Sequence, residues 1–153
     1  MKVRNQNASA FSLVELVMVM AIIGILAAMA VPRYSEVVAR QRVEAAARRL
    51  MTDIGLAQRY ARFTSTAKTV QFKPTLYTLV GVSNPDKGGA NYTVRISDEP
   101  YEARIVSADF GGDDEIVFDG FGDPDSGGSV VLRVGKFDHT VVIDETTGKA
   151  SIP

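Results

Sequence analysis

Three features are scarce in this 153-residue sequence: cysteine, histidine and, over one long stretch, charge. Because the chain has no cysteine, it cannot form a disulfide, a thiolate zinc site or a cysteine nucleophile. The formal net charge is -1, so no overall field favours nucleic acid as a partner. If this chain is exported, its fold must be stabilised by its hydrophobic core or by a bound metal.

The single histidine, His139, follows Asp138 and could form a catalytic triad with Ser126 or Ser129. Neither serine lies in the G-x-S-x-G turn that presents a nucleophile in hydrolases. The sequence also has no P-loop, dinucleotide-binding fingerprint or metallohydrolase motif. We therefore expect no catalytic residue and no enzymatic activity, with His139 at a strand edge facing water.

Acidic side chains cluster between Asp109 and Asp125, in a segment rich in glycine. Carboxylate oxygens on such loops are the ligands that calcium prefers. The spacing of Asp119, Asp123 and Asp125 differs from that of an EF-hand loop, however. We therefore expect a solvated acidic loop, with no metal site and no cofactor.

The stretch that lacks charge is Phe11–Val31, where Glu15 is the single charged residue. As a helix rising ~1.5 Å per residue, it is long enough to cross a bilayer core of ~30 Å. Its leucine, isoleucine, methionine and alanine favour helix. The preceding segment, 1–10, is polar and carries Lys2 and Arg4. We predict a transmembrane helix over residues 11–31.

Three interpretations of this N-terminus compete. It could be a signal peptide cleaved after Ala28-Met29-Ala30, a permanent anchor, or a leader removed before the apolar stretch. A carboxylate in an apolar span costs roughly 2.5–3.5 kcal/mol, and the first two interpretations give Glu15 no role. Cleavage between Ala10 and Phe11 would place Glu15 about one helical turn from a positive amino terminus, which gives it a partner.

A second pattern begins beyond Pro32, in residues 32–63. Apolar residues recur there every three or four positions, which indicates one buried face of an amphipathic helix: Val43, Ala47, Leu50, Ile54, Ala57 and Ala61. We predict one long, kinked helix from about Ser12 to about Phe63. The arginines of this half lie mostly off the apolar face, and we expect them to be solvated or to pair with neighbouring subunits.

From residue 64 onward the pattern changes to short runs rich in valine, isoleucine, threonine and tyrosine, separated by turn residues. Eight strands are predicted: Thr69–Phe72, Tyr77–Val82, Tyr92–Ile96, Ala103–Val106, Glu115–Phe118, Val130–Val134, Thr140–Asp144 and Ala150–Ile152. The clearest hairpin joins the last two. The sequence therefore predicts an α+β protein whose helix packs on an antiparallel sheet formed by residues 64–153.

The run Ala10-Phe11-Ser12-Leu13-Val14-Glu15-Leu16, followed by apolar residues to Val31-Pro32, resembles the processing and assembly segment of type IV pilins and type II secretion pseudopilins. In that family a prepilin peptidase cuts before an aromatic residue and methylates the new amino terminus, roles that map to Phe11. The family's glutamate maps to Glu15, and its helix-breaking glycine and proline map to Gly24 and Pro32. The family usually has glycine before the cut, where this chain has Ala10.

Other segments resemble the minor pseudopilin called H and related minor pilins: Ala45–Leu50, Ile54–Ala57, Val70–Phe72, Val141–Ile143 and Thr147–Lys149. The resemblance implies a pilin-like fold and a subunit of a periplasmic pseudopilus that drives protein export. It implies a single-pass protein of the bacterial inner membrane with its head in the periplasm. Its expected partners are other pseudopilins or pilins, prepilin peptidase, the inner-membrane assembly platform and the lipid bilayer.

Two alternatives stay open. One is a minor type IV pilus subunit whose head binds DNA or a secreted substrate, although we do not expect nucleic acid as a partner. The other is an independent periplasmic domain with an ordinary signal peptide. Flanking charges do not settle orientation, because Lys2 and Arg4 favour a cytoplasmic N-terminus whereas Arg33, Arg40 and Arg42 favour the reverse.

Overall fold

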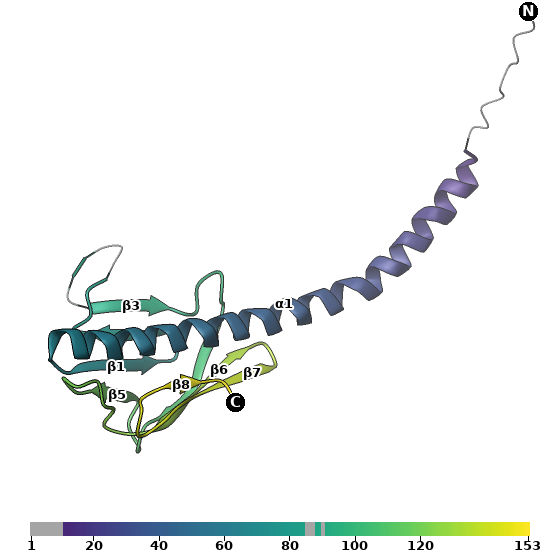
Figure 1. Cartoon of the computed structure of the whole chain (residues 1–153). Coiled ribbons are helices and arrows are strands. Elements are labelled where there is room, and N and C mark those ends of the chain that lie inside the picture. Colours follow the sequence, from purple (N-terminus) through teal and green to yellow (C-terminus); the bar gives the residue numbers. More distant parts are fainter. Residues whose placement is uncertain (1–10, 85–87, 90) are drawn as a thin grey trace, which may run out of the picture. The chain divides into compact units, whose positions relative to one another are not determined.

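The computed structural model describes residues 11–84, 88–89 and 91–153, apart from the side chains of residues 29–33. One long helix, α1 (Leu13–Thr64), precedes eight strands (Figure 1). The chain divides into two compact units, Met1–Val37 and Val38–Pro153. We call the second the head unit. It contains the second half of α1 and all the strands.

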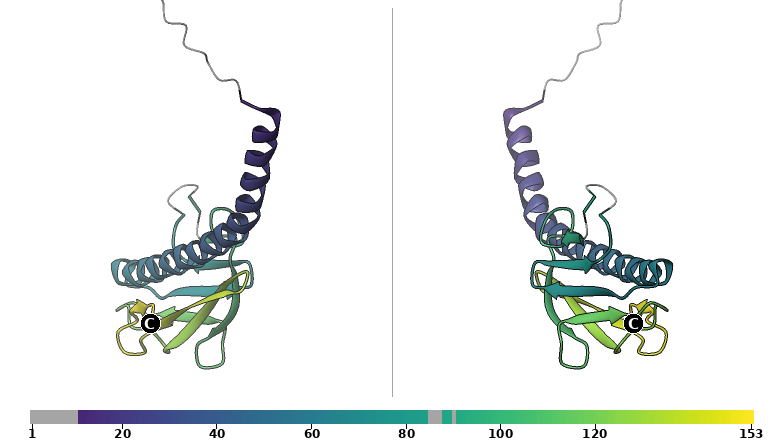
Figure 2. Two further views of the ribbon diagram at one scale, coloured as in Figure 1. Left: turned by 90° about the vertical axis from the view of Figure 1, so that its right-hand side faces the viewer. Right: turned by 90° about the vertical axis from the view of Figure 1, so that its left-hand side faces the viewer.

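The strands of the head unit form two antiparallel sheets (Figure 2). The first has the order β3-β2-β1-β5 and the second the order β4-β6-β7-β8. Their bounds are β1 Lys68–Lys73, β2 Leu76–Val80, β3 Asn91–Arg95, β4 Arg104–Asp109, β5 Glu115–Phe118, β6 Gly128–Val134, β7 Phe137–Ile143 and β8 Ala150–Ser151. All eight predicted strands are present, and the α+β class is confirmed.

The prediction of one sheet is wrong, since there are two. The division arises from pairings between strands that are not neighbours in the sequence. β5 pairs with β1, with Lys68 opposite Phe118, and β4 pairs with β6, with Arg104 opposite Arg133. Hairpin signals report pairing between consecutive strands and carry no information on such crossovers.

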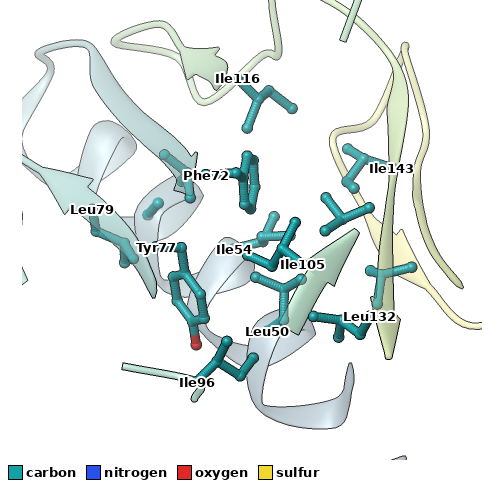
Figure 3. Close-up of a cluster of buried hydrophobic side chains, with 14 of the residues drawn as sticks. Leu50, Ile54, Phe72, Tyr77, Leu79, Ile96, Ile105, Ile116, Leu132 and Ile143 are labelled. Atoms are coloured by element: carbon teal, nitrogen blue, oxygen red, sulfur yellow. The ribbon is translucent and has the colours of Figure 1, made fainter. Parts of the chain in front are cut away.

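The predicted apolar face of α1 forms the centre of the core. All six of its residues are buried, and Ala46 is buried beside them. Alanines on this face let the helix approach the sheets closely, while larger side chains from both sheets fill the remaining space (Figure 3). The Phe72 and Phe110 rings stack with their centroids 5.3 Å apart. The core thus joins α1 to both sheets within the head unit.

The terminal hairpin is present as predicted. β7 pairs with β8, with Ile143 opposite Ala150. In the turn, the Gly148 amide donates to the Asp144 carbonyl at 2.8 Å, and the Asp144 amide donates to the Lys149 carbonyl at 3.1 Å. The Asp144 carboxylate also accepts from the amide of Thr147 at 2.7 Å and from its hydroxyl at 2.8 Å. These bonds fix the last turn of the chain.

Candidate assembly site

The candidate assembly site is the first part of α1 together with Phe11 before it. The first helical turn closes where the Leu16 amide donates to the Ser12 carbonyl at 3.1 Å. Glu15 lies in this turn and is exposed. Unpaired amides at a helix start carry partial positive charge, which favours a nearby carboxylate. The helix itself therefore stabilises the charge of Glu15, a contribution that the sequence argument had not included.

Large apolar side chains of this segment are exposed on all sides of the helix: Leu13, Val14, Leu16, Val17, Met18, Val19, Met20, Ile22, Ile23, Ile25 and Leu26. Phe11, just before the helix, is 79% exposed. A helix that is apolar all round is typical of a segment buried in lipid or in a helix bundle. Whatever covers these side chains must therefore come from outside this unit.

Gly24 and Pro32 both lie within α1, which is a single helix from Leu13 to Thr64. A side chain added at Gly24 would meet no atom within 4 Å, so the glycine is not required by close packing in this unit. Proline removes one backbone donor from a helix but does not always end it. α1 continues through both residues, and the helix break that the resemblance assigns to them stays a prediction.

The structure does not test the predicted leader or its cleavage. Ala10 and the leader, residues 1–10, lie outside the described residues. The cleavage bond between Ala10 and Phe11 therefore stays a prediction from the sequence. In the part of the chain that the structure describes, no helix combines the length and the apolarity that crossing a bilayer requires.

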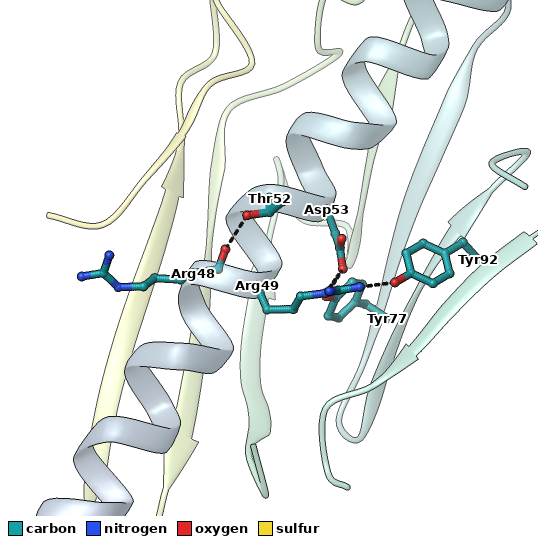
Figure 4. A network of polar contacts seen from close by, with 6 residues as sticks. All are labelled: Arg48, Arg49, Thr52, Asp53, Tyr77 and Tyr92. Atoms are coloured by element: carbon teal, nitrogen blue, oxygen red, sulfur yellow. Dashed lines mark hydrogen bonds and ion pairs between the residues drawn. The ribbon is translucent and has the colours of Figure 1, made fainter. Parts of the chain in front are cut away.

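The head unit contains a buried polar network that the sequence argument missed (Figure 4). Asp53 is 3% exposed. Its Oδ2 accepts from Nε of Arg49 at 2.9 Å and from the Tyr77 hydroxyl at 2.6 Å. Arg49 also donates to the Tyr92 hydroxyl, from the neighbouring strand. Burial, followed by the charge of Asp53, raises the pKa of Tyr77, so the phenol stays a donor at any physiological pH.

A signal for this network was present in the sequence. Asp53 lies three residues after Leu50 and beside Ile54, which places it next to the apolar face, and Arg49 precedes it by one turn. A carboxylate at the edge of a buried face needs a charged or hydrogen-bonding partner. Its tyrosine partners could not be found in this way, because they lie on strands far away in the sequence.

Other arginines of α1 are also paired within the chain. Arg42 forms an ion pair with Glu102, and Arg48 Nη2 lies 2.7 Å from the Glu44 carboxylate. The guanidinium of Arg40 lies 5.0 Å from the centre of the Phe137 ring. The expectation that these arginines would be solvated or pair with neighbouring subunits is therefore wrong for Arg42 and Arg49, whereas the Arg48 side chain is 72% exposed, as expected. The pairs of Arg48 with Glu44 and of Arg49 with Asp53 are four residues apart on α1, whereas the pairing of Arg42 with Glu102, on a loop of the same head, was not visible from helical spacing.

The acidic segment contributes hydrogen bonds to its own backbone. Asp119 Oδ1 accepts from the amides of Phe121 and Asp123, each at 2.9 Å, and Asp125 Oδ1 accepts from the Val117 amide at 3.0 Å. Across the described residues, no group of three or more acidic or histidine side chains is positioned to hold a metal. These carboxylates shape the loop between β5 and β6.

Gln58 of α1 holds this loop against the helix. Its Nε2 donates to the Gly122 carbonyl at 2.9 Å and to the Thr147 carbonyl at 2.8 Å. One side chain therefore binds both the β5–β6 loop and the β7–β8 turn. Arg62, one turn later, donates from Nε to the Phe121 carbonyl at 2.9 Å. The end of α1 is thus fastened to two separate loops of the head unit.

His139 is partly exposed, and at this position β7 has a partner strand on one side, β6. It lies within β7 opposite Leu132, is half-buried, and is close enough to Glu44 of α1 to lower the pKa of that carboxyl, although Arg48 is the main cause. The carboxylate of Asp138 binds the Arg133 guanidinium at 2.5 and 2.6 Å. That ion pair occupies both of its oxygens. The geometry therefore gives no support to a triad built on these residues.

Comparison with known families identifies a match at the start of the chain. Residues 5–31 match the family described as the prokaryotic N-terminal methylation motif, which is the hallmark of type IV pilin-like prepilins and pseudopilins. The match includes Phe11, Glu15 and Gly24, and it confirms the predicted resemblance. No curated protein matches the chain, and no solved structure does either.

Proposed function

We propose that this chain is a type IV pilin-like protein that is processed by prepilin peptidase, is a structural subunit of a type II secretion pseudopilus and belongs to the minor pseudopilins. The observation that carries the proposal is the exposed apolar segment from Phe11 to Leu26 with a single carboxylate, Glu15, at its start. Such a segment needs an apolar cover and a partner for one charge.

Before assembly, lipid supplies the cover. Residues 11–31 span the bacterial inner membrane once, and the head unit lies in the periplasm. On assembly, the same residues move from lipid into a bundle formed by the corresponding helices of other pseudopilins. Apolar surface is covered in both states, so the transfer costs little hydrophobic free energy. The inner-membrane assembly platform is the expected site of this transfer.

Glu15 then gives the assembly its specificity. Cleavage before Phe11 creates a positive amino terminus one helical turn from Glu15. In an apolar bundle an unpaired carboxylate is strongly disfavoured, and an ion pair with this amine, from the same or a neighbouring subunit, relieves the cost. One axial stagger brings the two charges together, so the pair also selects the register between subunits.

The role proposed for the head unit is structural rather than catalytic. Four of its carboxylates are committed to ion pairs or backbone caps: Asp53, Asp119, Asp138 and Asp144. The resemblance of the helix and of the terminal hairpin to the H-type subunit supports the minor pseudopilin assignment. A folded head fastened to α1 suits a subunit that is moved and packed as a rigid body.

The experiment that tests processing is mass spectrometry of the full chain isolated from membranes. We expect the mature protein to begin at Phe11 with a methylated amine. A start at Val31 would favour an ordinary signal peptide, and retained Met1 would favour a passive anchor. Ala10→Gly is the matched variant, because it installs the family's usual residue and should speed cleavage at the same bond.

The experiment that tests the system is deletion of the chain followed by complementation. If the chain is a pseudopilin, a normally secreted protein should accumulate in the periplasm of the deletion strain, and surface pili should be unaffected. Loss of pili with normal secretion would instead assign the chain to type IV pilus assembly. Both measurements are made on the same strain, and the two assignments predict opposite results.

A further inference from the structure

The β5–β6 loop holds one phenylalanine rigidly in solvent. Phe121 is 82% exposed. Its amide nevertheless donates to Asp119 at 2.9 Å and its carbonyl accepts from Arg62 at 2.9 Å, while the next carbonyl, of Gly122, is bound by Gln58. An exposed aromatic side chain on a fixed backbone loses little conformational entropy on binding, which is typical of an interface anchor.

The surroundings of Phe121 also fit an interface. A hollow of about 310 Å³ lies beside it and is lined by Arg62, Ser65, Gly120 and Phe121. No ion pair in the described part of the chain involves Arg62. Aromatic residues and arginine are the residues most enriched at protein interfaces. We call Phe121 and the adjoining Arg62 the Phe121 knob.

A mainly apolar pocket of about 180 Å³ lies against β4. It is lined by Phe72, Lys73, Pro74, Ile105, Val106, Ser107, Ala108 and Asp114. Phe72 and Ile105 also belong to the hydrophobic core (Figure 3). The register of β4 on β6 shifts between Ile105 and Ser107, which leaves Val106 unpaired and 48% exposed. We call this hollow the β4 pocket.

The knob and the pocket lie at opposite ends of the same strand pair. In the β1–β5 ladder, Lys68 pairs with Phe118 and Gln71 pairs with Glu115. The loop with Phe121 continues from the Phe118 end, whereas Asp114 precedes the Glu115 end. Two different patches at opposite ends cannot satisfy each other within one head. Between copies they would form a heterologous contact, which can repeat along an open filament.

The charges beside the Phe121 knob and the β4 pocket favour binding between them. The pocket carries Asp114 and Lys73, and the knob region carries Arg62 and, two residues after Phe121, Asp123. These four side chains form no ion pair among the described residues. Each surface therefore offers one positive and one negative group to its partner. Complementary charges of this kind fix register between bound surfaces.

We propose that the Phe121 knob of one subunit binds the β4 pocket of a second copy of this chain, with Arg62 facing Asp114 and Asp123 facing Lys73. The contact adds a head-to-head interface to the helix contacts of the assembly site, and it does not depend on the type of filament. Two copies in succession are sufficient, so it is compatible with a subunit that forms a small part of the filament.

Photocrosslinking of the full chain in its native membrane tests the contact. Phe121 is replaced by p-benzoylphenylalanine, which keeps an aromatic ring at the knob. We expect crosslinked dimers and higher multiples, with the linked peptide containing residues 72–74 or 105–108. The matched control places the same probe at Phe63, which is 88% exposed, follows Arg62 and does not line the hollow. It should not crosslink to that peptide.

Charge reversal supplies a second test in the same assay. Arg62→Glu and Asp114→Arg should each lower the crosslink yield roughly tenfold, because like charges then meet. The double variant should restore it, because each copy presents both reversed charges. Arg62→Glu also removes the hydrogen bond to the Phe121 carbonyl. Because Asp114→Arg cannot restore that bond, recovery of the crosslink in the double variant would come from the paired charges.

Three results would overturn the proposal: no rescue, crosslinks to another protein, or crosslinks to lipid. The start of the mature chain is measured in the same samples. Normal cleavage at Phe11 without a knob–pocket crosslink would remove this contact and leave the proposed function standing.

Discussion

Two carboxylates, Glu15 in the first turn of α1 and Asp53 in the head unit, each need a partner when apolar groups surround them. Asp53 is buried among side chains of its own chain and meets Arg49 and Tyr77 there. Glu15 is exposed in the isolated unit, and its pairing becomes necessary only when other helices or lipid surround it. Asp53 is therefore important for the stability of the head unit, whereas Glu15 has its proposed role in assembly.

Replacing Glu15 separates assembly from processing. Glu15→Val should leave cleavage before Phe11 intact, because the leader is unchanged. It should also make the helix easier to keep in lipid, since a charge costing roughly 2.5–3.5 kcal/mol is removed. We expect co-purification with other filament subunits to fall and membrane retention to rise. Glu15→Asp is the control that keeps the charge, and unchanged assembly of the valine variant would contradict the pairing.

Replacing Tyr77 measures the buried network. Tyr77→Phe removes the hydroxyl that donates to Asp53 at 2.6 Å. The free energy of unfolding should fall by about 1.5–3 kcal/mol, the usual contribution of a hydrogen bond to a charged group. Urea titration of a fragment covering residues 38–153 measures it. Tyr60→Phe, at a partly buried position on α1, is the matched control and should change stability by less than about 0.5 kcal/mol.

Acid stability should depend on Asp144. The Thr147 hydroxyl, followed by its amide, holds the pKa of Asp144 below the ordinary value of 3.8. A carboxyl whose pKa is lower when folded stabilises the fold above its unfolded pKa and loses that contribution as pH falls through the folded pKa. We expect unfolding midpoints measured from pH 6 to about pH 2 to fall less steeply in Asp144→Asn. Thr147→Val should reduce the slope in part.

At the scale of elements, the β5–β6 loop depends on a glycine for two reasons. Gly122 has a φ of +80°, and a Cβ added there would lie 2.3 Å from the Arg62 side chain. Gly111 has a similar φ of +72° but has open space around it. Both alanine variants should lose about 1–2 kcal/mol for the left-handed backbone. Gly122→Ala should lose more and should release the loop, and equal losses in urea titration would contradict the steric argument.

The elements themselves could be predicted from the sequence, but their pairing could not. Helical spacing identified the buried face from Val43 to Ala61, and β-rich runs identified all eight strands. These signals are local, because they depend on neighbours a few residues apart. The partition into two sheets follows from the β1–β5 and β4–β6 pairings, which join distant segments.

At the scale of the whole molecule, the charge of the strand region opposes nucleic-acid binding. Residues 64–153 are acidic, and Arg133, an obvious candidate for phosphate contact, is engaged by Asp138 at 2.5 Å. We expect a fragment covering residues 38–153 to show no retention on immobilised DNA even at low salt. Retention that falls steeply with salt would support a DNA-binding pilus subunit instead.

The residues of the candidate assembly site could be predicted because their signal, too, lies within one short segment of the sequence. Phe11, Glu15, Gly24 and Pro32 are identified by spacing along one helix, and the family match covers the first three and ends at residue 31. The features that fasten the head together have no such signature. Gln58 and Arg62 bind carbonyl groups, and any residue can supply a carbonyl. Backbone partners on distant loops leave no trace in the identity of their residues.

The double attachment of Gln58 has a mechanical consequence. If the chain is a filament subunit as proposed above, neighbouring subunits would pull on it through α1. A load along the helix axis would be shared by the Gly122 and Thr147 carbonyls and by the buried alanine face, all strained in shear. Bonds loaded in parallel must break together, which slows rupture. The end of α1 is therefore built to resist extraction from the sheets.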